Sequence, residues 1–406
     1  VVIDVPVDIQ LQEADFDYSG EIALRSYKPT VDGHPGQIKR ALKLIRESRR
    51  PVIMIGGGVI ISGAHEELRK FAEAINAPVT ATLMGLGGFP EDHPLYLGMP
   101  GMHGTAYANL AITDSDLLIT IGNRFDDRVT GKIDEFAPKA RIIHVDIDPT
   151  SISKNIKVDV PIVGDARNIL SEILATLTDG DKPDTTEWLA VVDGWKKKHP
   201  LTYDQKPDGY IKPQYVIRTL DELTSGEAVV VTEVGQNQMW SAQFYTFTKP
   251  RRFLSSGGLG TMGYGFPAAV GAAAVVRDRP VVCMAGDGSI QMNIQELATV
   301  ATYNIPVKIV ILNNHCLGMV RQWQELFYHR RYSGTPLKNP DFVKVADGYG
   351  VAASRVKDPG AVKDALRAML DHNGPYVLEV EIEPEENVFP MVPAGEAINR
   401  MIGGMS

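Results

Sequence analysis

The chain has 406 residues, of which 44% are hydrophobic and 22% charged, as in an ordinary globular protein with room for two or three domains. Its net charge of −9 and the lack of a basic block argue against nucleic acid as a partner, and no apolar run reaches the roughly 18 residues of a membrane span. With only two cysteines, Cys283 and Cys316, and no signal-peptide pattern, we expect a cytoplasmic protein without a disulfide framework.

Residues 1–12 have the composition of a strand, and an acidic, irregular stretch follows them. From about residue 28, helical and strand patterns alternate. The expected helices are 37–47 and 64–75, and the expected strands are 49–58, 77–83, 115–122 and 140–148. This alternation predicts a parallel sheet with helices on both faces, in a domain that spans residues 28–178.

Residues 179–200 mix turn formers with charges, which is typical of a link between domains. A second α/β pattern then occupies residues 201–406. Its expected elements are a helix at 213–223, a strand at 228–235, a glycine-rich stretch at 255–274, a helix at 360–372 and a strand at 376–382. The tail from residue 386 is rich in Pro and Gly and resembles a flap. The predicted fold class is therefore α/β, with two doubly wound parallel sheets.

Two polar clusters in this second domain each follow an apolar strand pattern. Gly286-Asp287-Gly288 follows PVVCMA, Asn313-Asn314 follows VKIVIL, and residues 290–303 between them have helical spacing. Such a unit brings both clusters to the carboxyl ends of neighbouring parallel strands. One carboxylate and one carboxamide suit Mg²⁺, which takes its other ligands from water and a phosphate. An ordinary Asp-Gly turn with an Asn-rich loop is the alternative.

Asp287 and Asn314 lie 27 positions apart (314 − 287), and this spacing resembles the motif of thiamine-diphosphate-dependent enzymes. The resemblance implies metal ligands from Asp287, Asn314 and the main-chain carbonyl of Cys316. It also implies an apolar Met262 beneath the thiazolium ring of the cofactor. The residues implied for thiamine diphosphate are Gln236, Asn237, Gly260, Met262, Gly286, Asp287, Gly288, Ser289 and Asn314.

The stretch CLGMVRQWQELFYHRRYSGT and the MVPAG of the tail closely resemble the acetohydroxyacid synthase (acetolactate synthase) catalytic subunits. Met319, Val320 and Trp323 share one helical face, for which core packing is one explanation and an apolar substrate channel the other. The resemblance implies the channel. Together with Gln236 and Met262, these three residues are the expected catalytic group.

In the first domain, Gly56-Gly57-Gly58 is only a weak dinucleotide-binding signal. GMHG and RFDDRVTG, however, resemble the FAD-binding stretch of the anabolic synthase, although residues 126–128 could also form a surface salt-bridge cluster. No second His or Cys at ligand spacing supports His103 as a metal ligand. The residues implied for FAD are Arg25, Gly56, Gly57, Gly58, Thr82, Leu83, Met102, His103, Gly104, Arg124, Asp127, Arg128, Val129, Asp146 and Asp165.

The resemblance implies decarboxylation of pyruvate and transfer of the two-carbon unit to pyruvate or 2-ketobutyrate, the first common step of branched-chain amino-acid biosynthesis. It also implies a homodimer, a small regulatory subunit and a glutamate on a further N-terminal domain. Residues 1–27 resemble the last strand of that domain and a linker, so we expect little activity from this chain until the domain is added. The alternatives are another thiamine-diphosphate enzyme (glyoxylate carboligase, pyruvate oxidase or a 2-keto-acid decarboxylase) or a non-catalytic cofactor-binding scaffold.

Overall fold

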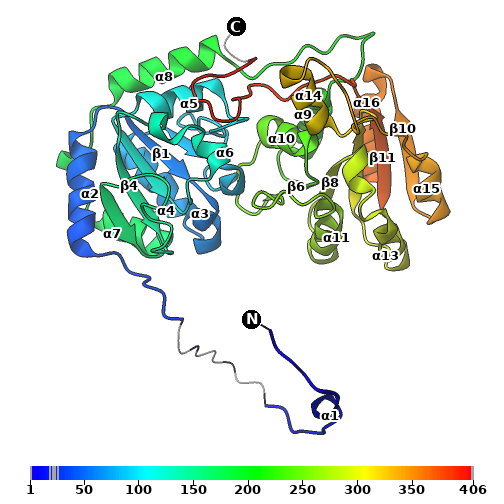
Figure 1. Cartoon of the computed structure of the whole chain (residues 1–406), viewed down its shortest axis with the longest axis horizontal. Helices are drawn as coiled ribbons and strands as arrows, with labels where there is room; N and C mark the ends of the chain where they lie inside the picture. The colour runs from blue at the N-terminus through cyan, green and yellow to red at the C-terminus, as the bar shows by residue number, and fades with distance from the viewer. Residues whose placement is uncertain (1, 18–19, 21–23, 25–26, 404–406) are drawn as a thin grey trace.

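The structure, a computed structural model, describes residues 2–17, 20, 24 and 27–403. Two units lie side by side, each built around a parallel sheet with helices on both faces (Figure 1). Within the described residues every paired strand is parallel to its neighbour. The predicted fold class is confirmed.

The first sheet has the order β2-β1-β3-β4-β5. Alternate residues of its strands face opposite layers, because successive side chains of a strand point to opposite sides. Ile53 and Ile55 pack with three helices on one face, and Val52 and Met54 pack with two helices on the other. The strands are β1 (Pro51–Ile55), β2 (Val79–Ala81), β3 (Leu117–Ile121), β4 (Arg141–Asp146) and β5 (Val160–Val163). The first face is covered by α2 (Pro35–Glu47), α4 (His65–Ile75) and α7 (Ala166–Thr176), and the second by α5 (Ala106–Asp114) and α8 (Thr186–Lys198).

Helix α8 corrects the expectation of a simple link at residues 179–200. Trp188 of this helix is buried and donates a hydrogen bond from its indole nitrogen to the Pro51 carbonyl, at 3.1 Å. Trp188 and Val192 complete the core of the first unit. The charges that suggested a linker lie at the ends and on the exposed side of this helix, which hides its short apolar face in the sequence.

The second sheet has the order β10-β11-β9-β8-β6-β7. Its strands are β6 (Val229–Thr232), β7 (Phe253–Leu254), β8 (Val281–Gly286), β9 (Lys308–Asn313), β10 (Ala352–Val356) and β11 (Tyr376–Glu381). One face packs against α9 (Pro213–Thr224), α10 (Gln236–Phe244) and α16 (Val362–Asp371). The other packs against α11 (Gly265–Val275), α13 (Leu297–Thr302) and α15 (Phe342–Gly348).

The helix expected at residues 290–303 is interrupted. A short helix α12 (Asp287–Ile290) is followed by a turn, a 3-10 helix at Ile294–Glu296 and then α13. In this turn, the side chain of Asn293 points toward the glycine-rich stretch, and the Asn293 amide donates to the Gly263 carbonyl at 2.6 Å. This contact explains why continuous helical spacing does not give a continuous helix.

The strand expected at residues 1–12 is wrong for the part that the structure describes. Residues 2–12 are exposed and contain one helical turn, α1 (Val7–Gln10). Their backbone hydrogen bonds are local, from Gln10 to Pro6 and from Leu11 to Val7. A strand needs a neighbouring strand for its N–H and C=O groups, and none of the described strands pairs with this segment.

The C-terminal tail joins the two units, crossing between them in Figure 1. Val392 donates to the Met102 carbonyl, Lys132 donates to the Glu396 carbonyl, and Ile398 lies in the core of the first unit. The tail therefore packs across both units. None of the helices in the described ranges is long and apolar enough to cross a membrane.

Candidate active site

The two predicted metal ligands follow neighbouring strands. Gly286 of β8 is in register with Leu312 of β9, so Asp287 and the Asn313-Asn314 pair leave the sheet at the same edge. Asn339, from a distant loop, joins them: its amide nitrogen lies 2.7 Å from a carboxylate oxygen of Asp287 and 3.0 Å from the side-chain oxygen of Asn313. One amide therefore holds the two polar clusters together.

The buried carboxylate of Asp287 forms no salt bridge with a described Lys or Arg. Asp287 is 1% exposed, and burial raises the pKa of its carboxyl to about 6, although the bond from Asn339 and the charge of the nearby His315 lower it. Within the described part of the chain, no Lys or Arg forms an ion pair with Asp287. A buried carboxylate without a counter-charge is unfavourable, so this position suits a cation.

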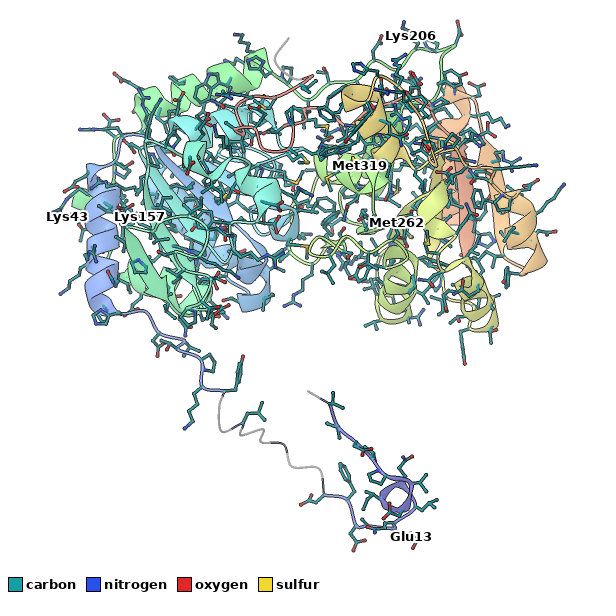
Figure 2. The ribbon with its side chains drawn as sticks, viewed as in Figure 1. Glu13, Lys43, Lys157, Lys206, Met262 and Met319 are labelled. Atoms are coloured by element: carbon teal, nitrogen blue, oxygen red, sulfur yellow. The ribbon has the colours of Figure 1, made fainter. Side chains whose placement is uncertain are left out.

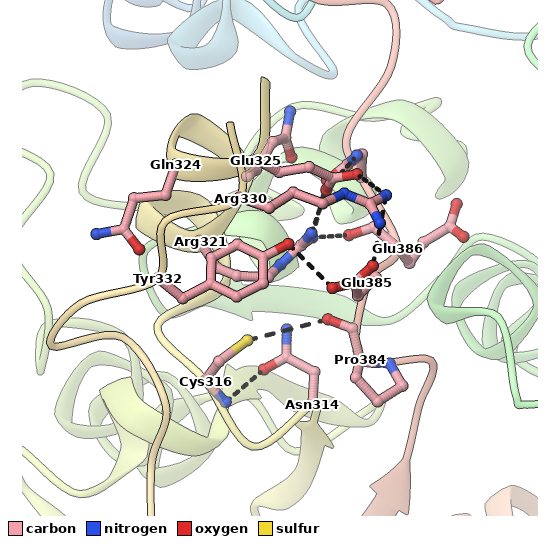
Figure 3. Close-up of polar contacts among 12 residues, drawn as sticks. Asn314, Cys316, Arg321, Gln324, Glu325, Arg330, Tyr332, Pro384, Glu385 and Glu386 are labelled. Carbon is pink, nitrogen blue, oxygen red and sulfur yellow. Dashed lines mark hydrogen bonds and ion pairs between the residues drawn. The ribbon is translucent and has the colours of Figure 1, made fainter. Parts of the chain in front are cut away.

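Asn314 forms the second half of the site. Its side-chain oxygen accepts the main-chain N–H of Cys316 at 3.2 Å (Figure 3). Its amide donates to Gln236 at 3.2 Å. A carboxamide oxygen has a second lone pair, which leaves it able to bind a metal. Among the described residues no group of three or more His, Cys, Asp or Glu could hold a metal ion, so the donors here would have to leave positions for water and phosphate.

Two amide side chains at the start of α10 face this edge. Gln236 is held between Asn314, Gln322 and the Glu386 carbonyl. The side-chain oxygen of Asn237 is buried and has no hydrogen-bond partner in the described ranges. An orphaned buried polar atom of this kind fits a site completed by a ligand. Ser289 is also at this edge, and its hydroxyl caps the turn through the Gly286 N–H, at 3.1 Å.

The glycine-rich stretch brings Met262 to the same place. Gly260 and Gly263 adopt positive φ angles of 63° and 91°, which only glycine adopts without strain. The methyl carbon of Met262 lies 4.0 Å from where a Cβ on Gly288 would stand. Figure 2 labels Met262 and Met319 on the side of the second unit that faces the first. The predicted apolar support and the predicted metal turn are thus neighbours.

Met319, Val320 and Trp323 lie on α14 (Gly318–Phe327). This helix buries its polar side, whereas a core helix would bury its apolar side. Its fully buried residues are Arg321 and Gln322, whereas Val320 is 50% exposed and the other two are half-buried. Met319 packs against the core of the second unit, so core packing explains this residue. Core packing does not explain Val320, whose side chain is turned to the outside.

Sequence reasoning missed three polar residues that organise the site: Asn339, Arg321 and Gln322. Arg321 donates to the Glu386 carbonyl and to Asn387, and it pairs with Glu325 (Figure 3). Gln322 accepts from Gln236 and from the Val388 N–H, and it donates to the Val388 carbonyl. These bonds attach the tail to α14. A lone Asn in a loop gives no sequence signal, but polar residues inside the RQW helix could have been read as a buried polar face.

The first unit brings most of the residues expected to bind FAD to its own carboxyl edge. Gly56 and Gly58 follow β1 and donate to the Ile121 and Gly122 carbonyls, both at 3.0 Å. Met102 donates to the Arg128 carbonyl at 2.8 Å, which packs the GMHG loop on residues 128–129. Val129 and Arg128 belong to the short helix α6 (Asp127–Thr130).

This edge faces the glycine-rich stretch of the second unit. A side-chain carbon of Leu83, next to Thr82, lies 3.2 Å from where a Cβ on Gly257 would stand. A guanidinium nitrogen of Arg124 lies 4.0 Å from the same position on Gly258. The two predicted cofactor sites are therefore neighbours across the junction of the units.

The arginines of this edge form ion pairs with its aspartates. Arg124 pairs with Asp126 at 3.2 Å, and Arg128 pairs with Asp127 at 3.1 Å, with side chains largely exposed. Asp146 accepts the Asp148 N–H at 2.9 Å. These contacts are those of the surface cluster considered as an alternative.

Asp165 has a structural role, as the cap of α7. It accepts from the N–H groups of Arg167 and Asn168 and from the Ser62 hydroxyl. Its carboxylate is thus committed to the fold. Arg25 lies outside the described residues.

His103 is buried between the units, beside a cavity of about 330 Å³ that is also lined by Glu91, Arg218 and Gln243. Burial lowers the pKa of His103 to about 4, so the imidazole is neutral near pH 7. Its Nδ1 atom has no partner in the described structure, and its carbonyl accepts the Gln243 amide at 2.9 Å.

Comparisons with known proteins agree with this geometry. Residues 233–380 match the family described as thiamine pyrophosphate enzyme, C-terminal TPP binding domain, and residues 38–173 match its central domain. The chain is 50% identical to a "Probable acetolactate synthase large subunit" of Methanocaldococcus jannaschii, covering 99% of this chain and 69% of that protein.

Two further relatives carry the same name. The acetolactate synthase large subunit of Corynebacterium glutamicum is 49% identical, over 98% of this chain and 65% of the relative. The isozyme 3 large subunit of Escherichia coli is 43% identical, over 99% of this chain and 71% of the relative. The chain therefore spans about two thirds of their length, and it belongs to the acetolactate synthase large-subunit family of thiamine pyrophosphate enzymes.

Proposed function

We propose that this chain forms the cofactor-binding part of an acetolactate synthase large subunit. The enzyme would decarboxylate pyruvate and join the two-carbon unit to pyruvate or 2-ketobutyrate. The observation that carries the proposal is Asp287, a buried carboxylate without a cation, held beside Asn313 and Asn314 at the edge of a parallel sheet. The names of the relatives supply the reaction.

The residues at this edge fit magnesium and a diphosphate. Asp287, the Asn314 oxygen and the Cys316 carbonyl would hold the metal, while Gln236, Asn237 and Ser289 would face the phosphates. The buried carboxylate of Asp287 supports the metal part of this assignment. When bound, thiamine diphosphate would supply the nucleophile for the keto carbon and would stabilise the electron pair that remains on this carbon when CO₂ leaves.

The chain's own residues would orient and enclose the reactants. Met262 would support the cofactor from below, and the apolar side chains of Met319, Val320 and Trp323 would exclude water from the keto acid. Gln236 would lie at the phosphate end, where Asn314, Gln322 and the tail fix its side chain, and its amide would exchange one of these bonds for a phosphate oxygen. Fixed positions of this kind favour reaction by proximity.

FAD is proposed for the edge of the first unit. Gly56–Gly58 and the GMHG loop allow close approach of a ligand to the backbone, and Arg124 and Arg128 would exchange their exposed ion pairs with Asp126 and Asp127 for a phosphate. The proximity of Leu83 and Arg124 to Gly257 and Gly258 supports neighbouring cofactors. Because the reaction has no net redox change, FAD would have a structural role. A small regulatory subunit is part of this proposal, since the relatives are named large subunits. A homodimer is part of it as well.

The test compares the 406-residue chain with the same chain preceded by the N-terminal third of the M. jannaschii relative. Both are supplied with pyruvate, thiamine diphosphate, Mg²⁺ and FAD, and acetolactate is measured as acetoin after acidification. We expect product from the extended protein, little from the 406-residue chain, and none from an extended Asp287→Ala variant. An extended, folded protein that consumes no pyruvate, or that gives acetaldehyde or acetate instead of acetoin, would refute the proposed reaction.

A further inference from the structure

Glu233, at the end of β6, is a glutamate for which the proposed function has no role. Its side chain is fully buried, and its main-chain N–H donates to the Met284 carbonyl of β8. It takes part in no salt bridge within the described ranges. Burial raises the pKa of this carboxyl, and only main-chain N–H groups act to lower it, Phe266 and Gly263 first. Such a group needs an explanation, because an unpaired buried charge is costly.

The carboxylate binds the glycine-rich stretch through its backbone. One oxygen accepts the N–H of Gly263 at 2.8 Å, and the other accepts the N–H of Phe266 at 2.9 Å. Phe266 lies in the first turn of α11, where N–H groups lack partners within the helix and favour negative charge. A single side chain therefore fixes both the turn after Met262 and the start of the following helix.

Gly263 is held through its carbonyl as well as through its N–H. The Asn293 amide donates to its carbonyl at 2.6 Å, from the break between α12 and α13. A Cβ on Gly265 would stand 2.5 Å from the Glu233 nitrogen, so the loop also lies directly on the end of β6. Met262 immediately precedes Gly263, and the methyl carbon of Met262 reaches the Gly286–Gly288 turn.

We propose that Glu233 is a positioning residue, which acts through the backbone of Gly263 to hold Met262 in place as the apolar support for thiamine diphosphate. The inference depends on the proposed function. It requires a carboxylate, because two N–H groups need two acceptors. Glutamine offers one acceptor and turns an NH₂ group toward the second N–H, and aspartate is one methylene too short to reach both.

The first experiment measures hydrogen exchange of the 406-residue chain without cofactor. In Glu233→Gln, we expect faster exchange at residues 260–266, with the rest of the second sheet unchanged. The matched control is Glu296→Gln, a nearby glutamate whose only described side-chain partner is the Thr299 hydroxyl, at 3.0 Å. Unchanged exchange at residues 260–266 in Glu233→Gln would overturn the inference.

The second experiment measures binding of thiamine diphosphate with Mg²⁺ by calorimetry in a double-mutant cycle. We expect Glu233→Gln and Met262→Ala each to weaken binding about tenfold, and the double variant to be hardly weaker than either, because both act on one element. A purely structural role would instead give losses that multiply. Should Glu233→Gln fail to fold, Asn293→Ala removes the other hold on Gly263 and is expected to give the same pattern.

The outcomes separate the two proposals. A wild-type protein that binds no thiamine diphosphate would refute the proposed function itself. Normal binding and normal exchange in Glu233→Gln, with weakened binding in Met262→Ala, would refute only the role of Glu233.

Discussion

The two units of this molecule have the same architecture but opposite chemistry at their carboxyl edges. Both are parallel sheets covered by helices on two faces. The edge of the first unit carries exposed arginines already paired with Asp126 and Asp127. The edge of the second carries buried amides and one buried carboxylate, Asp287, without a cation. The first edge is electrostatically complete as it stands, and the second is complete only with a ligand.

This difference predicts which edge should contribute more to the affinity for its ligand. A paired, exposed charge contributes little because water and salt screen it. A buried carboxylate lowers the stability of the free protein and is compensated only when a cation binds. Single substitutions should therefore have large effects on ligand binding at the second edge and small effects at the first.

The largest effect is expected for Asp287→Asn. It removes the charge that would bind Mg²⁺, so binding of thiamine diphosphate in the presence of Mg²⁺ should fall about 100-fold or more. The cofactor-free variant should be at least as stable as the wild type, because an uncompensated buried charge is gone. Calorimetry and urea unfolding measure the two quantities. The control is Asp278→Asn, whose carboxylate is exposed beside Arg279. A variant that binds normally would remove the basis of the comparison.

A second substitution addresses the tail that connects the two edges. Gln322→Ala leaves one N–H of the Gln236 amide and the Val388 N–H without a buried partner, so we expect a loss of about 2–3 kcal/mol in the free energy of unfolding. Urea unfolding measures it, and proteolysis should release the tail earlier than in the wild type. The exposed Gln295→Ala should change stability by less than about 0.5 kcal/mol. Equal stability of the two variants would show that the tail is not held through Gln322.

The contact between the units should depend on pH through Glu91. This residue accepts the Phe247 N–H of the second unit at 3.1 Å and the Tyr96 hydroxyl at 3.0 Å. Burial raises the pKa of Glu91 from 4.5 to about 8, so the folded state keeps a proton that the unfolded state releases.

Stability should consequently fall as the pH rises from about 4.5 to about 8, by at most about 1.4 kcal/mol per pH unit. The Glu91→Gln variant cannot titrate here and should lack this part of the slope. Urea unfolding of both proteins at pH 5.5 and 7.5 measures the difference. Parallel slopes for the two proteins would contradict the raised pKa.

The smallest effect is expected for Arg128→Ala at the first edge. Because its guanidinium is exposed and paired with Asp127, we expect FAD binding to weaken only about threefold. Quenching of flavin fluorescence measures the affinity, with Arg400→Ala, another exposed paired arginine, as the control. A loss of 100-fold would mean that the first edge depends on charge as strongly as the second.

The periodicity of the sequence was sufficient for the architecture. Apolar runs such as PVVCMA and VKIVIL became the buried parallel strands β8 and β9, since strands covered on both faces need continuous apolar residues. Their order along the chain also placed Asp287 and Asn314 at one edge. The exceptions were segments whose structure depends on distant partners. Residues 2–12 lack a neighbouring strand among the described residues, and α8 gains its stability by burying Trp188.

The sequence by itself thus determined the fold class, the family and the residues at the two sheet edges, because these follow from local spacing and from motifs. Only the tertiary structure decided which polar groups are satisfied. Asn339 reaches Asp287 across 52 positions, Gln322 reaches Val388 across 66, and Glu233 reaches Gly263 across 30. Hydrogen bonds of buried groups depend on proximity in space, and a sequence pattern carries no record of it.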